Sequence, residues 1–507
     1  MTTLAPDTSR SSATTQHPVA MRGLLLAVVV FSLAVRLITT PELDVGGDAT
    51  IKWYNGKVLL GVAAGDWEWT HHTARFGVML PMLLVQALGG TDPTFYYLPT
   101  FAVAALEAAL LFLIAARLAS PAFGFWVAIA LVLHPQMVIS GAQLLPGVYS
   151  AAYLLACTWC LLCYRDAHGG LRWLLLAALS LFLAYLSKLS NLFFLPGIAL
   201  ALWSWRSSLR DVACFWGALL LLIALEIGAY QLFTEYGFGR ISIVNATGLP
   251  MEPLDSWLGL FGRYAALPWS WTNVLAGYAI AALGLWLAAA RGHLDDRTVG
   301  VLWLPASFLV GFTFAVRSID PIIPAQVFNA RYLTAGLPFF ILAIGLFARF
   351  GLSLLPLPAL PALPPRRAAG AASIVAALLA WQLLAHFPGV AKHPIAKLSA
   401  ARASVADFIR GTPVVSSDRR GRGVRAWLHL FWNESVPELR VARFGPDGTE
   451  GFWYALHDAS TVTPEQMETV AYPGEVILID SQQFPDTDHF GFHLRRVRIG
   501  LDDQAAP

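Results

Sequence analysis

Long apolar blocks recur along this chain and constrain its fold more than any other feature. Many of them run for about 17–23 residues, the length that an α-helix needs to cross roughly 30 Å of hydrocarbon. The chain has 507 residues, of which 57% are hydrophobic and 13% charged, whereas a soluble globular protein carries about 25% charged residues. We therefore expect a polytopic α-helical membrane protein and not a string of soluble domains.

About eleven blocks are expected to span the membrane, judged by their length and apolar content. They are 22–39, 95–117, 122–139, 147–164, 171–187, 190–205, 211–232, 268–290, 298–316, 333–349 and 369–387. The block 76–89 is shorter and follows the polar run Thr70–Arg75. It is either a twelfth span or a helix that lies in the membrane interface.

Loop charge decides between these two alternatives, because cytoplasmic loops carry an excess of Lys and Arg. If the N-terminus is cytoplasmic and 76–89 does not cross, consecutive inside loops are all basic. They carry Arg117, then Arg165 and Arg172, Arg206 and Arg210, Arg291 and Arg297, and Arg366 and Arg367. If 76–89 crosses, every later loop inverts and the rule fails. We therefore expect 76–89 on the exterior face of the membrane, and the C-terminal end on the same side.

Composition divides the chain into three parts. Residues 1–20 are rich in Ser, Thr and Pro, which predicts a disordered cytoplasmic tail. Residues 21–390 form the membrane module, with long exterior loops at 40–94, 233–267 and 317–332. Residues 391–507 alternate helix and strand signals, which predicts a small soluble exterior α/β domain. The net charge of +2 gives no support to nucleic-acid binding.

The expected elements of the C-terminal part are short. Residues 396–409 and 424–432 have helical spacing, and strands are predicted at Pro413–Ser417, Leu439–Phe444 and Glu475–Asp480. No glycine-rich phosphate loop follows any of these strands, so a nucleotide site is not indicated there.

The first exterior loop carries an amphipathic helical pattern from Asp44 to Val62. The apolar stripe is Ile51, Tyr54, Val58 and Val62, and the opposite polar stripe is Asp44, Asp48, Lys52 and Asn55. Such a helix would lie flat on the bilayer and present its carboxylates to the exterior. There a carboxylate can act as general base on an acceptor hydroxyl, with Asp48 the first candidate and Asp44 the second.

Two alternatives stay open for this segment. Because Gly46 and Gly47 precede Asp48, a permissive turn can replace the start of the helix. A solvated helix face without any chemistry also explains the polar stripe.

Glu68, His71 and His72 follow the same segment, between Trp67 and Arg75. A substrate or a divalent metal could bind His72, Tyr54 and Glu68. Adjacent histidines point apart on a helix, however, so a chelating pair is not implied. Nothing in the sequence requires a cofactor.

Cationic residues stand at the exterior ends of apolar blocks. Ionisable groups are costly in lipid and usually face a cavity, so Lys188 and Arg331 are candidates to stabilise a lipid-linked phosphate or a phosphate leaving group. Arg75 is a third candidate. Snorkelling toward the interface is the alternative explanation. Glu107 and Glu226 fall within spans and are expected to be paired inside the bundle.

Several of these segments together resemble the GT-C glycosyltransferases, polyprenyl-phosphate-sugar-dependent enzymes that include protein mannosyltransferases and lipid A aminoarabinose transferases. Asp48-Ala49, Tyr54 and Gly61 are similar to the first-loop pattern of that family. The segment 72–81 occupies the place of its His/Lys-Pro-Pro-Leu motif but lacks the paired prolines. Further matches in chain order are His134-Pro135, Ser140, Gln143–Pro146, Leu183–Lys188, Arg331–Leu333 and Leu337-Pro338.

The resemblance covers roughly residues 22–350 and implies a GT-C-like fold. It also implies transfer of a sugar from a polyprenyl-phosphate donor to a hydroxyl of a lipid, glycan or protein acceptor, with inversion at the anomeric carbon. Asp48 would be the general base, and Lys188, Arg331 and Arg75 would hold the donor phosphate.

Two other classes of function remain open at this stage. A transporter or flippase of lipid-linked sugars would need polar residues along a path through the bundle. A non-catalytic membrane assembly factor would work through its soluble domain. The polar residues of this chain concentrate at the exterior face, which favours the enzyme.

Overall fold

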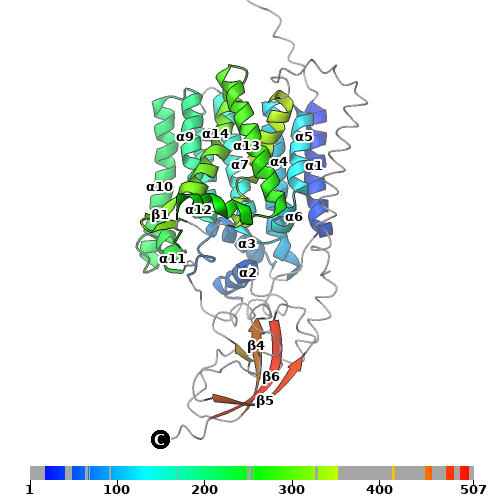
Figure 1. The fold of residues 1–507 in the computed structure, drawn as a ribbon, viewed down its shortest axis with the longest axis vertical. Coiled ribbons are helices and arrows are strands. Elements are labelled where there is room, and N and C mark those ends of the chain that lie inside the picture. The colour runs from blue at the N-terminus through cyan, green and yellow to red at the C-terminus, as the bar shows by residue number, and fades with distance from the viewer. Residues whose placement is uncertain are drawn as a thin grey trace, which may run out of the picture.

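The computed structural model shows a bundle of helices with a small β-sheet beyond one end (Figure 1). It describes residues 18–39, 48–62, 67, 69–90, 93–167, 170–247, 253–254, 256–325 and 329–351, and the backbone of 414–416, 451–458, 476–484 and 492–501. Several expectations lie outside these residues, namely those on 1–17, Asp44, Glu68, 369–387, 396–409, 424–432 and Leu439–Phe444.

Six helices in the described part of the chain are long and apolar enough to cross a membrane. They are α1 (Pro18–Thr39), α4 (Leu98–Leu118), α7 (Pro146–Asp166), α10 (Leu209–Phe233), α13 (Trp269–Ala290) and α14 (Asp296–Phe314). Because a helix rises about 1.5 Å per residue, their lengths of roughly 19–25 residues correspond to about 28–38 Å. The chain is therefore a multi-pass helical membrane protein.

Shorter apolar helices complete the bundle. They are α3 (Phe76–Ala87), α5 (Pro121–Leu133), α8 (Leu171–Ser187), η3 (Leu189–Phe194) with α9 (Leu195–Ser204), and α16 (Leu337–Leu346) with the π-helical η5 (Phe347–Gly351). All except α3 coincide with predicted spans, but the expected total of eleven is not confirmed. The 12 residues of α3 rise only about 18 Å. That is too short to cross the hydrocarbon, in line with the prediction that 76–89 does not span.

The predicted span 122–139 is wrong as a single helix, because the chain breaks at His134. Helix α5 ends at Leu133, and α6 (Pro135–Ser140) follows at once. The ring of Pro135 disfavours helical conformation at the residue before it, and His134 is extended, with φ −65° and ψ 130°. The carbonyl of Val132 instead accepts a hydrogen bond of 3.3 Å from Arg36 of α1.

The two acidic residues predicted to be paired inside the bundle differ in their partners. Glu226 on α10 accepts a hydrogen bond of 2.9 Å from the Tyr185 hydroxyl. Glu107 on α4 is fully buried, and neither of its carboxylate oxygens has a hydrogen-bond partner among the described residues. Its electrostatic counterpart is the buried guanidinium of Arg36. The prediction of a direct pair is therefore confirmed for Glu226 only.

Short elements gather at one end of the bundle, where Figure 1 shows α2, α11, α12 and β1. They are α2 (Asp48–Leu59), η2 (Pro93–Tyr97), α11 (Arg240–Thr247), α12 (Trp257–Gly262), η4 (Arg263–Ala266), the antiparallel pair β1 (Val316–Ile319) and β2 (Ile322–Pro324), and α15 (Ala330–Leu333). These elements fall in or next to the three loops predicted to be long and exterior.

The C-terminal part forms a four-stranded sheet in the order β3-β4-β6-β5. Its strands are β3 (Val414–Ser416), β4 (Gly451–Asp458), β5 (Val476–Phe484) and β6 (Phe492–Leu501). β3 pairs in parallel with β4, and β6 pairs antiparallel with both β4 and β5. β3 and β5 were predicted, whereas β4 and β6 were missed. In β6 the adjacent Arg495 and Arg496 interrupt the alternation that would have revealed a strand.

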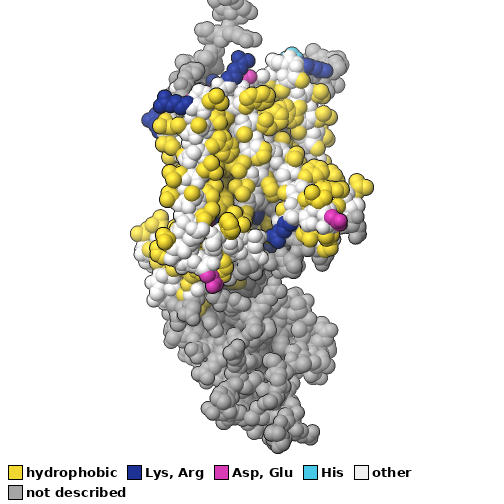
Figure 2. Space-filling model, turned by 90° about the vertical axis from the view of Figure 1, so that its left-hand side faces the viewer, with side chains coloured by type: hydrophobic (Ala, Val, Ile, Leu, Met, Phe, Trp, Pro, Cys, Tyr) yellow, Lys and Arg dark blue, Asp and Glu magenta, His cyan; other side chains and the backbone are white. Residues whose placement is uncertain are grey.

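The outside of the bundle is suited to lipid. Figure 2 shows hydrophobic side chains over its height, with Lys and Arg mainly at the upper end. Leu221 and Leu225 on α10 and Leu283 on α13 are exposed. A contiguous exposed apolar surface of this kind is unusual in soluble proteins and marks a contact with an apolar medium.

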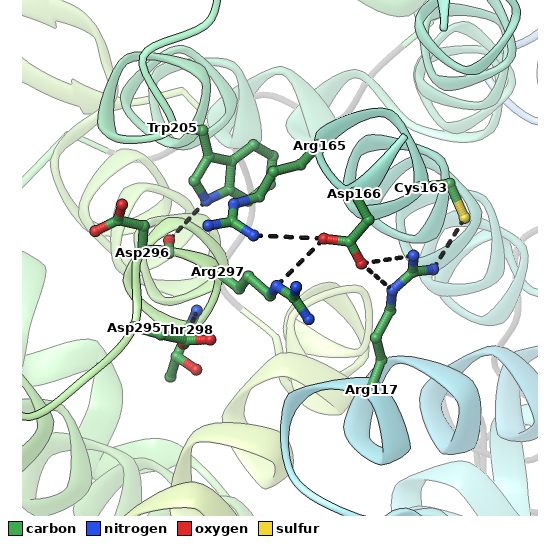
Figure 3. Close-up of polar contacts among 9 residues, drawn as sticks. All are labelled: Arg117, Cys163, Arg165, Asp166, Trp205, Asp295, Asp296, Arg297 and Thr298. Carbon is green, nitrogen blue, oxygen red and sulfur yellow. Dashed lines mark hydrogen bonds and ion pairs between the residues drawn. The ribbon is translucent and has the colours of Figure 1, made fainter. Parts of the chain in front are cut away.

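Asp166, at the end of α7, joins the ends of three helices (Figure 3). Its Oδ2 lies 2.6 Å from Nε and Nη2 of Arg117 on α4. Its Oδ1 lies 3.2 Å from Nε of Arg297 on α14 and 3.4 Å from Nη1 of Arg165. Three of the loops that were predicted to lie on the same side therefore meet at one end of the bundle.

We predict that Asp166→Asn lowers the thermal stability of the detergent-purified protein. The substitution leaves three guanidinium groups without their carboxylate, at a cost of roughly 1–2 kcal/mol once partial solvent screening is allowed for. The thermal unfolding midpoint should fall by a few degrees. The control is Asp296→Asn, which neutralises an exposed carboxylate in the same region. Equal midpoints for the two variants would show that the cluster does not stabilise the bundle.

Candidate active site

A cavity with an empty volume of about 330 Å³ lies at the end of the bundle opposite Asp166. Pro146 at the start of α7 lines the cavity, and Asp166 ends the same helix, so roughly 30 Å separates the two places. The cavity is lined by Asp48, Arg75, Ser140, Leu145, Pro146, Gly147, Lys188, Arg331 and Tyr332. The structure thus brings together Asp48, Arg75, Lys188 and Arg331, which are far apart in the sequence.

Two glycines allow this convergence. A Cβ at Gly77 would lie 2.1 Å from Oγ of Ser187, so only glycine lets α3 approach the end of α8. That contact brings Arg75, next to the start of α3, close to Lys188. A Cβ at Gly147 would lie 2.8 Å from Cβ of Thr334. Its absence lets α7 pack against the segment that carries Arg331.

Asp48 is the first residue of α2, where the helix dipole favours a negative charge. Its Oδ1 lies 3.4 Å from Nε2 of His72, and its Oδ2 lies 3.4 Å from Nη1 of Arg331. Burial acts to raise the pKa of Asp48, but the neighbouring cations, Lys52 first and then Arg331 and Arg75, outweigh it and hold the pKa at about 2. The carboxylate is therefore ionised at neutral pH.

Lys52 is a member of this site that the sequence placed only on a polar helix stripe. The alternative of a solvated polar stripe is wrong for Lys52 and Asn55, which are both buried. Lys52 Nζ donates a hydrogen bond of 2.7 Å to the Asp48 carbonyl. Burial lowers the pKa of Lys52 to about 7. The sequence signal that could have revealed the role of Lys52 was its place four residues after Asp48, the candidate base.

Lys188 follows the last residue of α8, where the backbone becomes extended before η3 begins. Its Nζ lies over the ring of Tyr332, 3.4 Å from the ring centroid, in a cation–π contact. Burial, together with Arg75 and Arg331, lowers the pKa of Lys188 well below its ordinary value. A buried cation with like charges as neighbours favours an anion in the cavity.

Arg75 and Arg331 reach the cavity from two different elements. Arg75 precedes α3, after a turn in which Thr70 and Thr73 hydrogen-bond to one another. Burial lowers the pKa of Arg75. The side chain of Asn329 accepts from the Arg331 N–H at 3.1 Å, which caps α15 and directs the start of this short helix. Arg331 is half exposed, at 47%.

His72, Tyr54 and Glu68 were the candidates for substrate or metal binding. Burial and Lys52 lower the pKa of His72 to about 2, so the ring is neutral beside Asp48. Tyr54 is buried on α2 and does not line the cavity. Glu68 lies outside the described residues. Within the described chain, no group of three or more His, Cys, Asp and Glu side chains is placed to hold a metal ion.

This protein is similar to known proteins in structure but not in sequence. No family model and no curated protein matches the sequence. The fold is similar to that of ArnT from Cupriavidus metallidurans in the apo state, with a TM-score of 0.56 and 12% sequence identity over 96% of this chain and 100% of that chain. It is also similar to the same protein bound to undecaprenyl phosphate, with a TM-score of 0.54 and 12% identity over 96% and 99% of the two chains.

These likenesses extend over nearly the whole of both chains, including the C-terminal part. At 12% identity the agreement is one of architecture. The chain therefore has a polytopic membrane fold similar to that of ArnT, in line with the fold class that its sequence motifs predicted.

Proposed function

We propose that this protein is a membrane glycosyltransferase that moves a sugar from a polyprenyl-phosphate donor to an acceptor hydroxyl, with inversion at the anomeric carbon. The observation that carries the proposal is the set of charged side chains that line the cavity. One ionised carboxylate, Asp48, lies there among three cationic side chains, Arg75, Lys188 and Arg331. This combination supplies a base and an anion-binding site within reach of the same bound molecule.

The cations bind the phosphate of the donor. Arg75 and Arg331 lie with buried Lys188 around one carboxylate, and a phosphate bound there offsets the arginine charges and favours the protonated form of Lys188. Arginine adds planar, paired N–H donors that match phosphate oxygens. ArnT, whose fold this chain shares, has been crystallised with undecaprenyl phosphate, a ligand of the class proposed here.

The reaction needs a single displacement. Asp48 takes the proton of the acceptor hydroxyl, and the acceptor oxygen forms a bond to the anomeric carbon of the sugar. The bond from that carbon to the phosphate oxygen breaks, and its electron pair stays on the phosphate. The products are the glycosylated acceptor and polyprenyl phosphate, whose added negative charge Lys188, Arg331 and Arg75 stabilise.

A bound phosphate also makes Asp48 a better base. In the empty cavity the cations hold the pKa of Asp48 at about 2, where a carboxylate has little affinity for a proton. An anion that engages Arg331 and Arg75 offsets part of their effect on Asp48, so its pKa rises. His72, whose Nε2 lies 3.4 Å from Oδ1 of Asp48, is neutral and adds no positive charge that would lower this pKa again. Donor binding thus prepares the acceptor step.

The loop charges support an orientation in which the cavity faces the exterior of a bacterial inner membrane, with the N-terminus cytoplasmic. The acceptor would be a lipid, glycan or protein that reaches the cavity from that side, in glycan or cell-envelope biosynthesis. The C-terminal domain, 391–507, would lie on the same side and would help to bind it.

We predict that Asp48→Asn lowers the rate of transfer by roughly 10²–10⁴-fold, because the amide cannot accept the acceptor proton. Purified protein in detergent is incubated with a panel of polyprenyl-phosphate sugars and acceptors, and release of polyprenyl phosphate is measured. Asp296→Asn, at the other end of the bundle, should retain wild-type turnover. Wild-type turnover in Asp48→Asn would remove Asp48 from the mechanism. No release from any donor would favour a transporter or an assembly factor.

We predict that Lys188→Met and Arg331→Met each weaken donor binding by roughly 10- to 100-fold, the cost of losing one charged hydrogen-bond donor to a phosphate. Affinity is measured with undecaprenyl phosphate by a quenching or thermophoresis titration. Arg172→Met removes a cation at the opposite end and should not change the affinity. Unchanged affinity in both site variants would place the phosphate elsewhere.

Lys52 should make donor binding pH-dependent. Its pKa is about 7, so it is charged below pH 7 and neutral above it. A polyprenyl-phosphate sugar is a phosphodiester whose charge stays constant over this range. Its affinity should be roughly threefold to tenfold higher at pH 6 than at pH 8, because one more cation then lies beside Asp48, a residue that lines the cavity. Lys52→Met should abolish that difference, and a difference that persists in this variant would contradict the assignment.

A further inference from the structure

A chain of side chains leads from the bundle to the wall of the cavity. Trp271 on α13 is buried, and its Nε1 donates a hydrogen bond of 3.3 Å to Oε1 of Gln136 on α6. The other end of the Gln136 amide, Nε2, donates a hydrogen bond of 2.6 Å to Oγ of Ser140. Ser140 is 1% exposed and lines the cavity.

The order of donors in this chain is fixed by chemistry. An indole N–H can only donate, so the Gln136 atom facing Trp271 is its carbonyl oxygen. The amide nitrogen then faces Ser140 and can only donate to it. The Ser140 oxygen is therefore an acceptor toward Gln136, and its own proton is left for another partner. The described residues show no acceptor hydrogen-bonded to that proton.

The surroundings of Gln136 keep this arrangement in place. The His134 ring lies edge-on to Trp271, with centroids 5.7 Å apart, and its Nδ1 accepts from the Gln136 backbone N–H at 3.2 Å. The second contact depends on the helix break at Pro135, because in a continuous helix the Gln136 N–H would donate to the Val132 carbonyl. Gln136 and Ser140 then meet as neighbours four residues apart on α6.

We propose that Ser140 is a further ligand-binding residue, whose hydroxyl donates a hydrogen bond to an oxygen of the polyprenyl-phosphate sugar in the cavity. Gln136, held by Trp271, is the positioning residue that keeps the hydroxyl proton free for the ligand. The inference rests on the proposed function. The charged side chains that line the cavity supply cationic hydrogen-bond donors and one carboxylate. A neutral hydroxyl at a fixed place adds a hydrogen bond whose direction selects the position of one ligand oxygen.

The ligand oxygen can belong to the phosphate or to a sugar hydroxyl, and two probes separate these sources. Undecaprenyl phosphate presents the phosphate alone. A panel of undecaprenyl-phosphate sugars presents both. Binding is measured for each probe on the purified full-length protein, without any need for turnover.

Ser140→Ala should weaken binding roughly tenfold through the loss of one hydrogen bond to the ligand. The control, Ser180→Ala, removes a hydroxyl on α8 that donates to the Leu176 carbonyl of its own helix. It should bind as wild type does. A loss for both probes assigns the phosphate oxygen, and a loss for the sugar-bearing probes alone assigns a sugar hydroxyl.

Two variants of Gln136 test the positioning role. Gln136→Glu presents a carboxylate that accepts the Ser140 proton, so the hydroxyl turns away from the ligand and affinity should fall at least as far as in Ser140→Ala. Gln136→Met keeps the volume but makes no hydrogen bond, so the hydroxyl stays free and affinity should fall by less than about threefold. The double variant with Ser140→Ala and Gln136→Glu isolates the effect of the added charge. A merely structural role would make the Met variant the worse of the two.

Wild-type affinity of Ser140→Ala for every probe would overturn the inference while leaving the proposed function intact. Equal effects of Gln136→Glu and Gln136→Met would overturn the positioning role. If the wild-type protein bound neither undecaprenyl phosphate nor any of its sugar derivatives, the inference and the proposed function would fall together.

Discussion

Burial of charged side chains around the cavity sets the electrostatics on which the site depends. Lys52 and Lys188 are buried, and Asp48 is partly buried beside them. In such a place charges interact far more strongly than in bulk water. The same burial raises the cost of every unpaired charge. Asp48 is ionised because its cationic neighbours outweigh that cost, and the cations in turn share one carboxylate. The cavity is therefore short of negative charge until a ligand enters.

The backbone creates this cavity by interrupting helices at one end of the bundle. The α5–α6 break at Pro135, the extended residue Lys188 and the short α15 each end a regular hydrogen-bond ladder near the same place. Irregular backbone at membrane depth is tolerated only where it is buried in protein or lines a cavity. Arg36 compensates one break by donating to the Val132 carbonyl. The breaks thus supply the polar groups and their geometry together, and Ser140 lines the cavity because α6 is short.

The sequence predicted much of the fold because its strongest signals are local. Apolar length gave most helices, and loop charge grouped Arg117, Arg165 and Arg297, which meet at Asp166. Conversely, the hydropathy of 122–139 is too uniform to reveal that the helix breaks at His134. The residue that could have indicated the break was Pro135. Lys188 and Arg331 were nominated by their places at span ends, Asp48 by a polar helix stripe and Arg75 by its place in the first exterior loop. Lys52, Ser140 and Tyr332 stood in the stripe or in the motif matches without a role, because their roles arise from contacts between segments that no periodicity encodes. Asp44 and Glu68 lie outside the described residues.

The two ends of the bundle differ in how strongly water screens their positive charges. At Asp166 three arginines surround one carboxylate, but their side chains are 25–37% exposed, so water screens the surplus. At the other end Lys188 in the cavity wall and Lys52 beside Asp48 are buried, so water screens their charge less. The free energy of that arrangement falls when an anion enters, so the electrostatic strain of the empty site becomes affinity for the ligand. The same anion offsets the cations around Asp48 and raises its basicity, which ties the binding of the phosphate to the activation of the acceptor.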